Sequence, residues 1–172
     1  NAWNNRGIAK KKIGDLDGAI ADYTRAIELD PKDVLFWHTR GVIKKKKGDL
    51  DGAIEDYTKA IELDPKYVNS WYNRGNTKKD MGDLTGAIED LTRVIELDPK
   101  DLDAWNNRGL AKKEKGDLDG AILDYNKAIE INPEYPSAWY NRAVSRRKLG
   151  DLAGAIEDFT QVIKLDPRSK KS

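Results

Sequence analysis

The sequence contains no cysteine, which excludes disulfide bonds and thiol chemistry. It has one histidine, His38, and lacks a phosphate-binding glycine motif, a metal-ligand spacing and a calcium-binding loop. A lone histidine is more often a surface or core residue than a ligand or a base. We therefore expect neither an enzyme nor a bound cofactor or metal.

Long hydrophobic runs are also missing. No stretch of apolar residues reaches the length of a membrane span, so we expect no membrane partner. The first residues show no signal-peptide pattern, which makes the cytoplasm the default expectation for location. The net charge is only +1, but the cations and the carboxylates fall into different segments of a repeated unit.

That unit is marked by tryptophan. All five tryptophans of the chain are spaced 34 residues apart, at Trp3, Trp37, Trp71, Trp105 and Trp139. A unit of this length cannot bury its apolar face alone and stacks on its neighbours as a solenoid. The period predicts a single solenoid domain over residues 1–172, with repeats at 1–33, 34–67, 68–101, 102–135 and 136–169.

Each repeat predicts two helices. In the first, residues 1–13 are expected to form a helix that Gly14 ends, and Asp15 caps a second helix over residues 16–29. Pro31 then ends the unit, because proline cannot continue a helix. The pattern returns in every repeat, the last of which ends at Pro167.

Six residues of the first repeat resemble the tetratricopeptide repeat (TPR) signature: Trp3, Gly7, Ala19, Tyr23, Ala26 and Pro31. The resemblance recurs five times, with Leu91, Ala143 and Phe159 as substitutions that keep a small or apolar residue. It implies an all-α, right-handed superhelix of five helix–turn–helix units and ten antiparallel helices. It also implies a non-catalytic scaffold that binds proteins or peptides in a concave groove.

Three rows are predicted to build the structure. The tryptophans are expected in the core, and an arginine row is expected to pair with an aspartate row across the seam between the two helices of each repeat. The arginines are Arg6, Arg40, Arg74, Arg108 and Arg142, and the aspartates are Asp22, Asp56, Asp90, Asp124 and Asp158. Lys10 and its equivalents replace the family's usual aromatic residue, and we expect them to send their charges to the rim.

Three further rows on the first helices are predicted to bind. The asparagine row is Asn5, Asn73, Asn107 and Asn141, with Thr39 in the second repeat, and Asn76 shares its stripe. Beside it lies a variable row, Asn4, His38, Tyr72, Asn106 and Tyr140. The basic row is Lys11, Lys45, Lys79, Lys113 and Arg147. Asparagine amides can hold a peptide backbone, and aligned cations favour an acidic segment.

The carboxylate clamp of TPR proteins that bind chaperone tails is not complete in this sequence. Asn76 and Asn107 match its two asparagines, but Tyr72, Ser137 and Asn141 stand where cations are needed. We therefore expect no chaperone co-factor of that kind.

The leading function is a scaffold for an extended, acidic peptide segment. Two alternatives stay open. The uncapped terminal repeats could stack head to tail, since the chain closes after Pro167 with only Arg168 to Ser172. Nucleic-acid binding by the basic helices ranks lower, because few aromatics are interleaved with the lysines.

Overall fold

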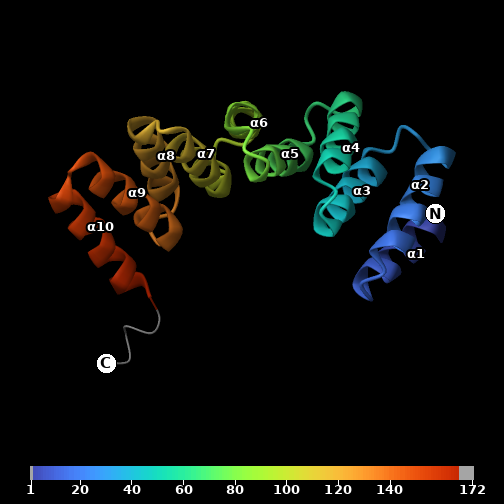
Figure 1. The fold of residues 1–172 in the computed structure, drawn as a ribbon, viewed down its shortest axis with the longest axis horizontal. Coiled ribbons are helices and arrows are strands. Elements are labelled where there is room, and N and C mark those ends of the chain that lie inside the picture. The colour runs from blue at the N-terminus through green and yellow to red at the C-terminus, as the bar shows by residue number, and fades with distance from the viewer. Residues whose placement is uncertain (1, 167–172) are drawn as a thin grey trace. The chain divides into compact units, whose positions relative to one another are not determined.

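A computed structural model describes residues 2–166 and contains ten α-helices in that range (Figure 1). They are α1 (Ala2–Lys12), α2 (Leu16–Leu29), α3 (Val34–Lys47), α4 (Leu50–Leu63), α5 (Val68–Asp80), α6 (Leu84–Leu97), α7 (Leu102–Lys115), α8 (Leu118–Ile131), α9 (Pro136–Leu149) and α10 (Leu152–Leu165). The all-α prediction is confirmed, and the predicted helix bounds agree with the observed ones within two residues in the first repeat.

The turn inside each repeat follows the predicted glycine and aspartate chemistry. Gly48 closes α3 in the left-handed conformation, with φ of 94°, which side chains rarely adopt. Asp49 then accepts a hydrogen bond from the backbone N–H of Gly52 at 3.0 Å and caps the start of α4. The short turn brings the two helices back side by side as an antiparallel pair.

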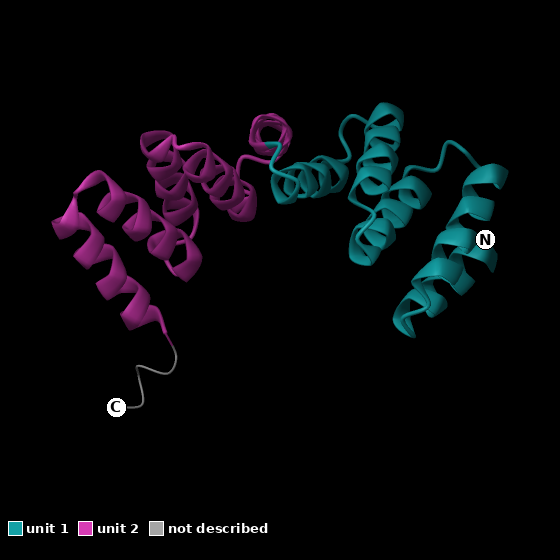
Figure 2. Cartoon of the chain, in the orientation of Figure 1, with its two compact units in different colours: residues 1–83 teal, residues 84–172 magenta. Residues whose placement is uncertain are grey.

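The chain forms two compact units (Figure 2). In residues 1–83, α1 packs on α2, α2 on α3, α3 on α4, and α5 on both α4 and α3. In residues 84–172, α6 packs on α7, α7 on α8, α8 on α9, and α9 on α10. Within each unit the helices thus pack as successive neighbours, and a single domain over the whole chain stays a prediction.

Tyrosine rings of the second helices fill the core in the first, second and fourth repeats. Tyr23 and Tyr57 are almost fully buried, and each ring faces a glycine of the first helix. A Cβ on Gly7 or Gly41 would lie 2.8 Å from the facing ring, so only glycine allows this close approach. The signature glycine thus permits the same close packing at both positions.

The end of the last repeat, Pro167 with the segment from Arg168 to Ser172, lies outside the described residues, as does Asn1. Within residues 2–166, no helix has the length and apolar character needed to cross a membrane.

Candidate functional site

Arginine and aspartate pair across the seam between the helices of a repeat. Arg40 on α3 donates from Nε and Nη2 to the carboxylate of Asp56 on α4, at 2.8 and 2.7 Å. The same two-bond contact joins Arg6 to Asp22, Arg108 to Asp124, and Arg142 to Asp158, at 2.6 to 2.9 Å. The aspartates are buried. The predicted pairing is confirmed in these four repeats, where it joins two helices of one unit.

A second cation reaches each of these carboxylates from one turn further along the first helix. Lys44 Nζ lies 3.1 Å from Asp56 Oδ2 and donates to the carbonyl of Gly52 at 3.3 Å. Lys10, Lys112 and Arg146 contact Asp22, Asp124 and Asp158 in the same way. The prediction that this row sends its charges to the rim is wrong, because a buried carboxylate accepts a third charge-assisted bond.

The Asp22 pKa shows the electrostatic result. The hydrogen bond from Arg6 is the largest cause and outweighs burial, and with a further bond from Lys10 it lowers the pKa of Asp22 to about 2. The carboxylate therefore stays ionised at neutral pH and is not poised to transfer a proton.

The tryptophans take part in the same seam, but they are only partly buried. The Arg40 guanidinium lies over the Trp37 ring, 5.0 Å from its centroid, and the other four arginines sit over their tryptophans at 4.7 to 4.9 Å. Trp37 Nε1 also donates to the carbonyl of Pro31 at 2.9 Å. Trp3, Trp37, Trp105 and Trp139 pack against the buried core, as expected, while the indole N–H of Trp37 reaches the loop between repeats.

The remaining candidates form what we call the first-helix stripe, which comprises Asn5, His38, Tyr72, Asn73, Asn76, Asn107, Tyr140, Asn141, Lys11, Lys45, Lys79, Lys113 and Arg147. In residues 1–83 an open hollow of about 580 Å³ lies beside this stripe, between α1 and α3. It is lined by Asn4 and Ile8 of α1, by Leu35, Phe36 and Thr39 of α3, by Tyr23 of α2, and by the carboxylates of Asp30 and Asp33 in the loop before α3. Asn5, next to Asn4, is exposed.

His38 is held inside the protein rather than offered to a ligand. Its Nδ1 lies 3.0 Å from Ser70 Oγ on α5, and its ring packs against Tyr57 and Tyr67. Burial, with a smaller effect from the charge of Lys11, lowers the pKa of His38 to about 4. The neutral ring therefore acts as a packing residue between α3, α4 and α5.

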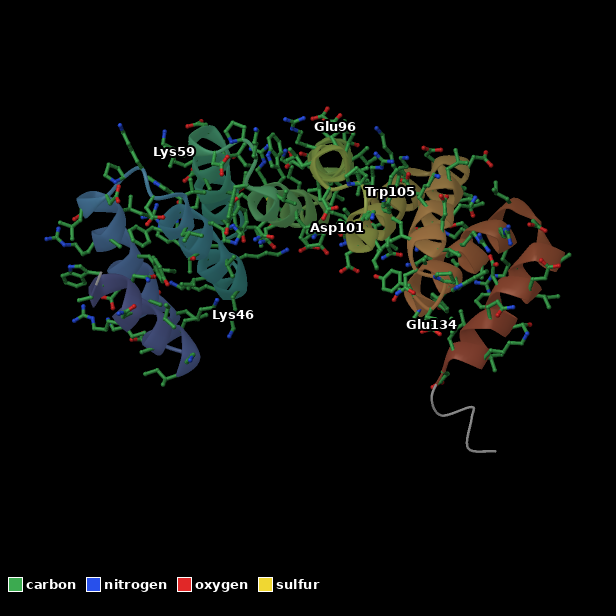
Figure 3. The ribbon with its side chains drawn as sticks, turned by 180° about the vertical axis from the view of Figure 1, so that it is seen from behind. Lys46, Lys59, Glu96, Asp101, Trp105 and Glu134 are labelled. Carbon is green, nitrogen blue, oxygen red and sulfur yellow. The ribbon has the colours of Figure 1, made fainter. Side chains whose placement is uncertain are left out.

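The basic row is partly neutralised where α3 meets α5. Lys45 Nζ lies 2.9 Å from the Asp80 carboxylate, and Lys79 Nζ lies 3.7 Å from it. Lys11, in contrast, makes no ion pair with any residue in 2–166. Lys46 lies near the end of α3, is exposed and points away from the ribbon (Figure 3). Among the lysines of the first helices in this unit, the unpaired charge of Lys11 and Lys46 thus lies near the ends of α1 and α3.

Asn73 and Asn76 of α5 are partly buried, and their amides make no hydrogen bond within the described part of the chain. The row changes character in residues 84–172, where Asn141 Nδ2 of α9 donates to Asn106 Oδ1 of α7 at 2.9 Å. Asn106 is buried by this contact. The asparagine row is therefore not a uniform ladder, since Asn141 joins two first helices.

Two further stripe residues lie near the end of the chain. Tyr140 is half exposed and its ring packs edge-on against Phe159, with centroids 5.8 Å apart. Arg147 is exposed. Lys113 and Asn107 are partly buried on α7, and Tyr72 is partly buried on α5.

Comparison with protein families agrees with this geometry. A family model described as TPR repeat matches residues 43–82, 75–116 and 109–146. Models described as tetratricopeptide repeat match residues 1–33, 136–169 and 22–55. This chain belongs to the tetratricopeptide repeat family. The TPR models cover most of the chain, so the paired helices and the seam are those of a known protein-interaction module.

Solved TPR structures resemble the chain along nearly its full length. A crystal structure of MamA is 28% identical, covers 96% of this chain and 97% of its own, and has a TM-score of 0.91. MamA from Desulfovibrio magneticus RS-1 is 22% identical, covers 99% and 96%, and has a TM-score of 0.92. YrrB, described as a TPR protein with an unusual peptide-binding site, is 23% identical, covers 96% and 85%, and has a TM-score of 0.82. Among curated proteins no sequence matches.

The TPR sequence pattern missed five residues of the hollow, which are Ile8, Asp30, Asp33, Leu35 and Phe36. Phe36 stands where the later repeats carry Ser70, Ala104 and Ala138, so its unusual bulk was visible in the sequence. Ile8 and Leu35 are apolar but exposed, and their exposure cannot be read from the sequence without the fold. Within residues 2–166 no cluster of histidine, cysteine or carboxylate side chains could hold a metal ion.

Proposed function

We propose that this TPR chain is a non-catalytic interaction module that binds an extended, acidic peptide segment along the part of its first-helix stripe in residues 1–83. One observation carries the proposal: Lys11 lacks an ion pair and lies one turn along α1 from Ile8, which lines the open hollow. The apolar side chains of the hollow beside an unpaired cation suit a peptide with an apolar side chain next to a carboxylate that lies toward Lys11 and away from Asp30 and Asp33, which also line the hollow.

The hollow supplies the apolar contact. Ile8 is 41% exposed and Leu35 is 55% exposed, so a bound apolar side chain would remove both from water. Asn4 and Thr39 on the lining add polar groups that both donate and accept hydrogen bonds. Such groups can bind the backbone of an extended segment whatever its sequence.

Charge supplies the preference for acidic segments. Lys11 and Lys46 make no ion pair in the described range, so a peptide carboxylate near either would not have to displace an internal partner. Lys45 and Lys79 share Asp80, and their attraction for a peptide is weaker for that reason. Binding through exposed cations should weaken as the salt concentration rises.

Selection from a library of random short peptides tests the proposal. The wild type should enrich peptides with Asp or Glu beside a large apolar residue. Lys11→Glu should lower the affinity for the strongest selected peptide about tenfold, because it replaces an attraction with a repulsion. Lys66→Glu makes the same charge change at an exposed site on the loop before α5, and should leave the affinity unchanged.

Three results would overturn the proposal. The first is selection of peptides without acidic enrichment, and the second is an equal effect of Lys11→Glu and Lys66→Glu on the affinity. The third is tight, strongly salt-dependent binding of a short RNA together with no selected peptide, which would favour nucleic acid instead.

A further inference from the structure

The hollow between α1 and α3 has a counterpart one repeat later, where a side chain of the protein occupies the space. His38 stands at the position that Asn4 has in the first repeat. Its ring packs against Tyr57 and Tyr67, with centroids 5.7 and 5.1 Å apart, and its Nδ1 lies 3.0 Å from Ser70 Oγ. The space between two successive first helices can therefore hold a group that is both flat and polar.

In the first repeat the equivalent space is open and lined by carboxylates. Asn4 stands in place of the larger His38, and Asp33 stands in place of Tyr67. Asp33 and Asp30 both line the resulting hollow of about 580 Å³. A ligand group thus has room here, and it meets negative charge where the next repeat offers a ring.

Each of the two carboxylates has one oxygen left for a ligand. Asp30 Oδ1 accepts a hydrogen bond from the backbone N–H of Lys32 at 3.2 Å, and Asp33 Oδ1 accepts one from that of Leu35 at 2.9 Å. Within residues 2–166, neither carboxylate makes an ion pair. The backbone bonds shape the loop, and the other oxygen of each group is available to a cation.

A buried hydroxyl without a partner lines the same hollow. Tyr23 is 1% exposed, and its hydroxyl makes no hydrogen bond to any residue in 2–166. The large majority of side-chain polar groups buried to this extent have a hydrogen-bond partner. A ligand group that donates hydrogen bonds would supply the missing one, and it would suit the two carboxylates as well.

Opposite charges lie at opposite ends of this site. Asn4 is near the start of α1, where α2 ends and α3 begins, and thus at the level of Asp30 and Asp33. Lys11 follows Asn4 by seven residues, which is about 10 Å along the helix. An extended peptide rises about 3.3 Å per residue, so groups that reach the two ends are about three residues apart.

We propose that the hollow binds a basic side chain, Lys or Arg, of the same peptide whose carboxylate lies near Lys11. The cation lies against Asp30 and Asp33 and donates to the hydroxyl of Tyr23. An apolar residue between the two charged ones packs on Ile8. The inference rests on the proposed function and narrows its ligand to a segment with an acidic and a basic residue about three positions apart.

The peptides that the wild type selects give the first test. They should carry Lys or Arg about three positions from the acidic residue. The strongest of them, acetylated and amidated at its ends, is then compared with a version in which Gln replaces the basic residue. The wild type should bind the basic version about tenfold more tightly, because its cation meets two carboxylates.

A double variant, Asp30→Asn with Asp33→Asn, removes both charges and keeps the loop. Asn132 accepts the equivalent backbone bond in the fourth repeat at 2.9 Å, and asparagine caps a helix about as well as aspartate. This variant should bind the two peptides equally. The control, Asp64→Asn with Asp101→Asn, makes the same changes at the equivalent positions of later loops and should keep the tenfold preference.

The outcomes separate this inference from the proposed function. Acidic peptides that depend on Lys11 but lack Lys or Arg would overturn the inference alone, as would an unchanged preference in the Asp30 and Asp33 double variant. Basic peptides that depend on Asp30 and Asp33, without acidic enrichment, would support the cation site and contradict the proposed function. A library that yields no peptide would overturn both.

Discussion

Equivalent residues of different repeats make the same contacts in the seam between the paired helices, but different contacts on the first-helix stripe. In the seam, Arg40 holds buried Asp56 through two short bonds, and the same arrangement returns at Arg142 and Asp158. On the stripe, equivalent positions do different things, since Asn141 bonds another first helix while Asn5 is exposed. Repetition is therefore strict where a change would leave a charge unpaired.

This difference separates stability from recognition. Breaking a buried ion pair leaves an uncompensated charge, which costs far more than losing an exposed one. Stripe residues with free polar groups carry no such penalty and can vary from repeat to repeat. Seam substitutions should therefore change folding, and stripe substitutions should change binding.

The largest effect is expected from the seam. Asp124→Ala leaves the charges of Arg108 and Lys112 without a carboxylate and should lower the free energy of unfolding by about 3 to 5 kcal/mol. Urea denaturation followed by circular dichroism measures it. Asp119→Ala, at an exposed site on the same helix, is the control and should change stability by less than about 1 kcal/mol.

His38 tests whether a stripe residue that packs against neighbouring helices contributes to folding stability, as the seam residues do. Its folded pKa of about 4 lies below the unfolded value of 6.5, so the neutral ring stabilises the fold above pH 6.5. That stability should be lost as the pH falls from 6.5 towards 4, by about 3 kcal/mol in total. The unfolding free energy of His38→Gln should lack this part of the pH dependence, and an equal slope in both proteins would contradict it.

Lys11 tests the stripe, where a substitution should change binding rather than folding. Lys11→Glu should lower the affinity for a selected acidic peptide about tenfold, while the free energy of unfolding changes by less than about 0.5 kcal/mol. Fluorescence anisotropy and urea denaturation of the same sample give both numbers. A large loss of stability would mean that Lys11 belongs to the folded framework.

The smallest effect concerns a polar group inside the core. The Tyr125 hydroxyl is buried without a hydrogen-bond partner in the described residues, so Tyr125→Phe removes an unsatisfied group and little packing. The midpoint of thermal unfolding should stay the same or rise by a few degrees, equivalent to about 1 kcal/mol or less. A fall would show that the hydroxyl is bonded.

Much of the fold follows from the sequence because its signals are local and repeated. Tryptophan spacing, the glycine and aspartate of each turn, and the proline at each unit end predicted the helices that are observed. Arg40 and Asp56 could be paired from the constancy of their rows alone. Both predictions rest on contacts that recur from one repeat to the next in the same way.

The stripe could not be predicted as well, because its contacts depend on neighbours that differ. The sequence does not show that Asp80 neutralises Lys45, or that Asn106 accepts a bond from Asn141. The hollow beside Ile8 depends on how Phe36 packs against Tyr23, with ring centroids 6.4 Å apart. Predicting such contacts requires the positions of side chains in two neighbouring repeats.

Backbone amide chemical-shift mapping with a selected acidic peptide tests the central claim most directly. The account predicts shifts at Asn4, Ile8, Lys11 and Thr39, with the second helices α2 and α4 unaffected on their outer faces. Shifts that gather instead on the outer faces of α2 and α4, with α1 and α3 unchanged, would contradict the assignment of recognition to the first-helix stripe.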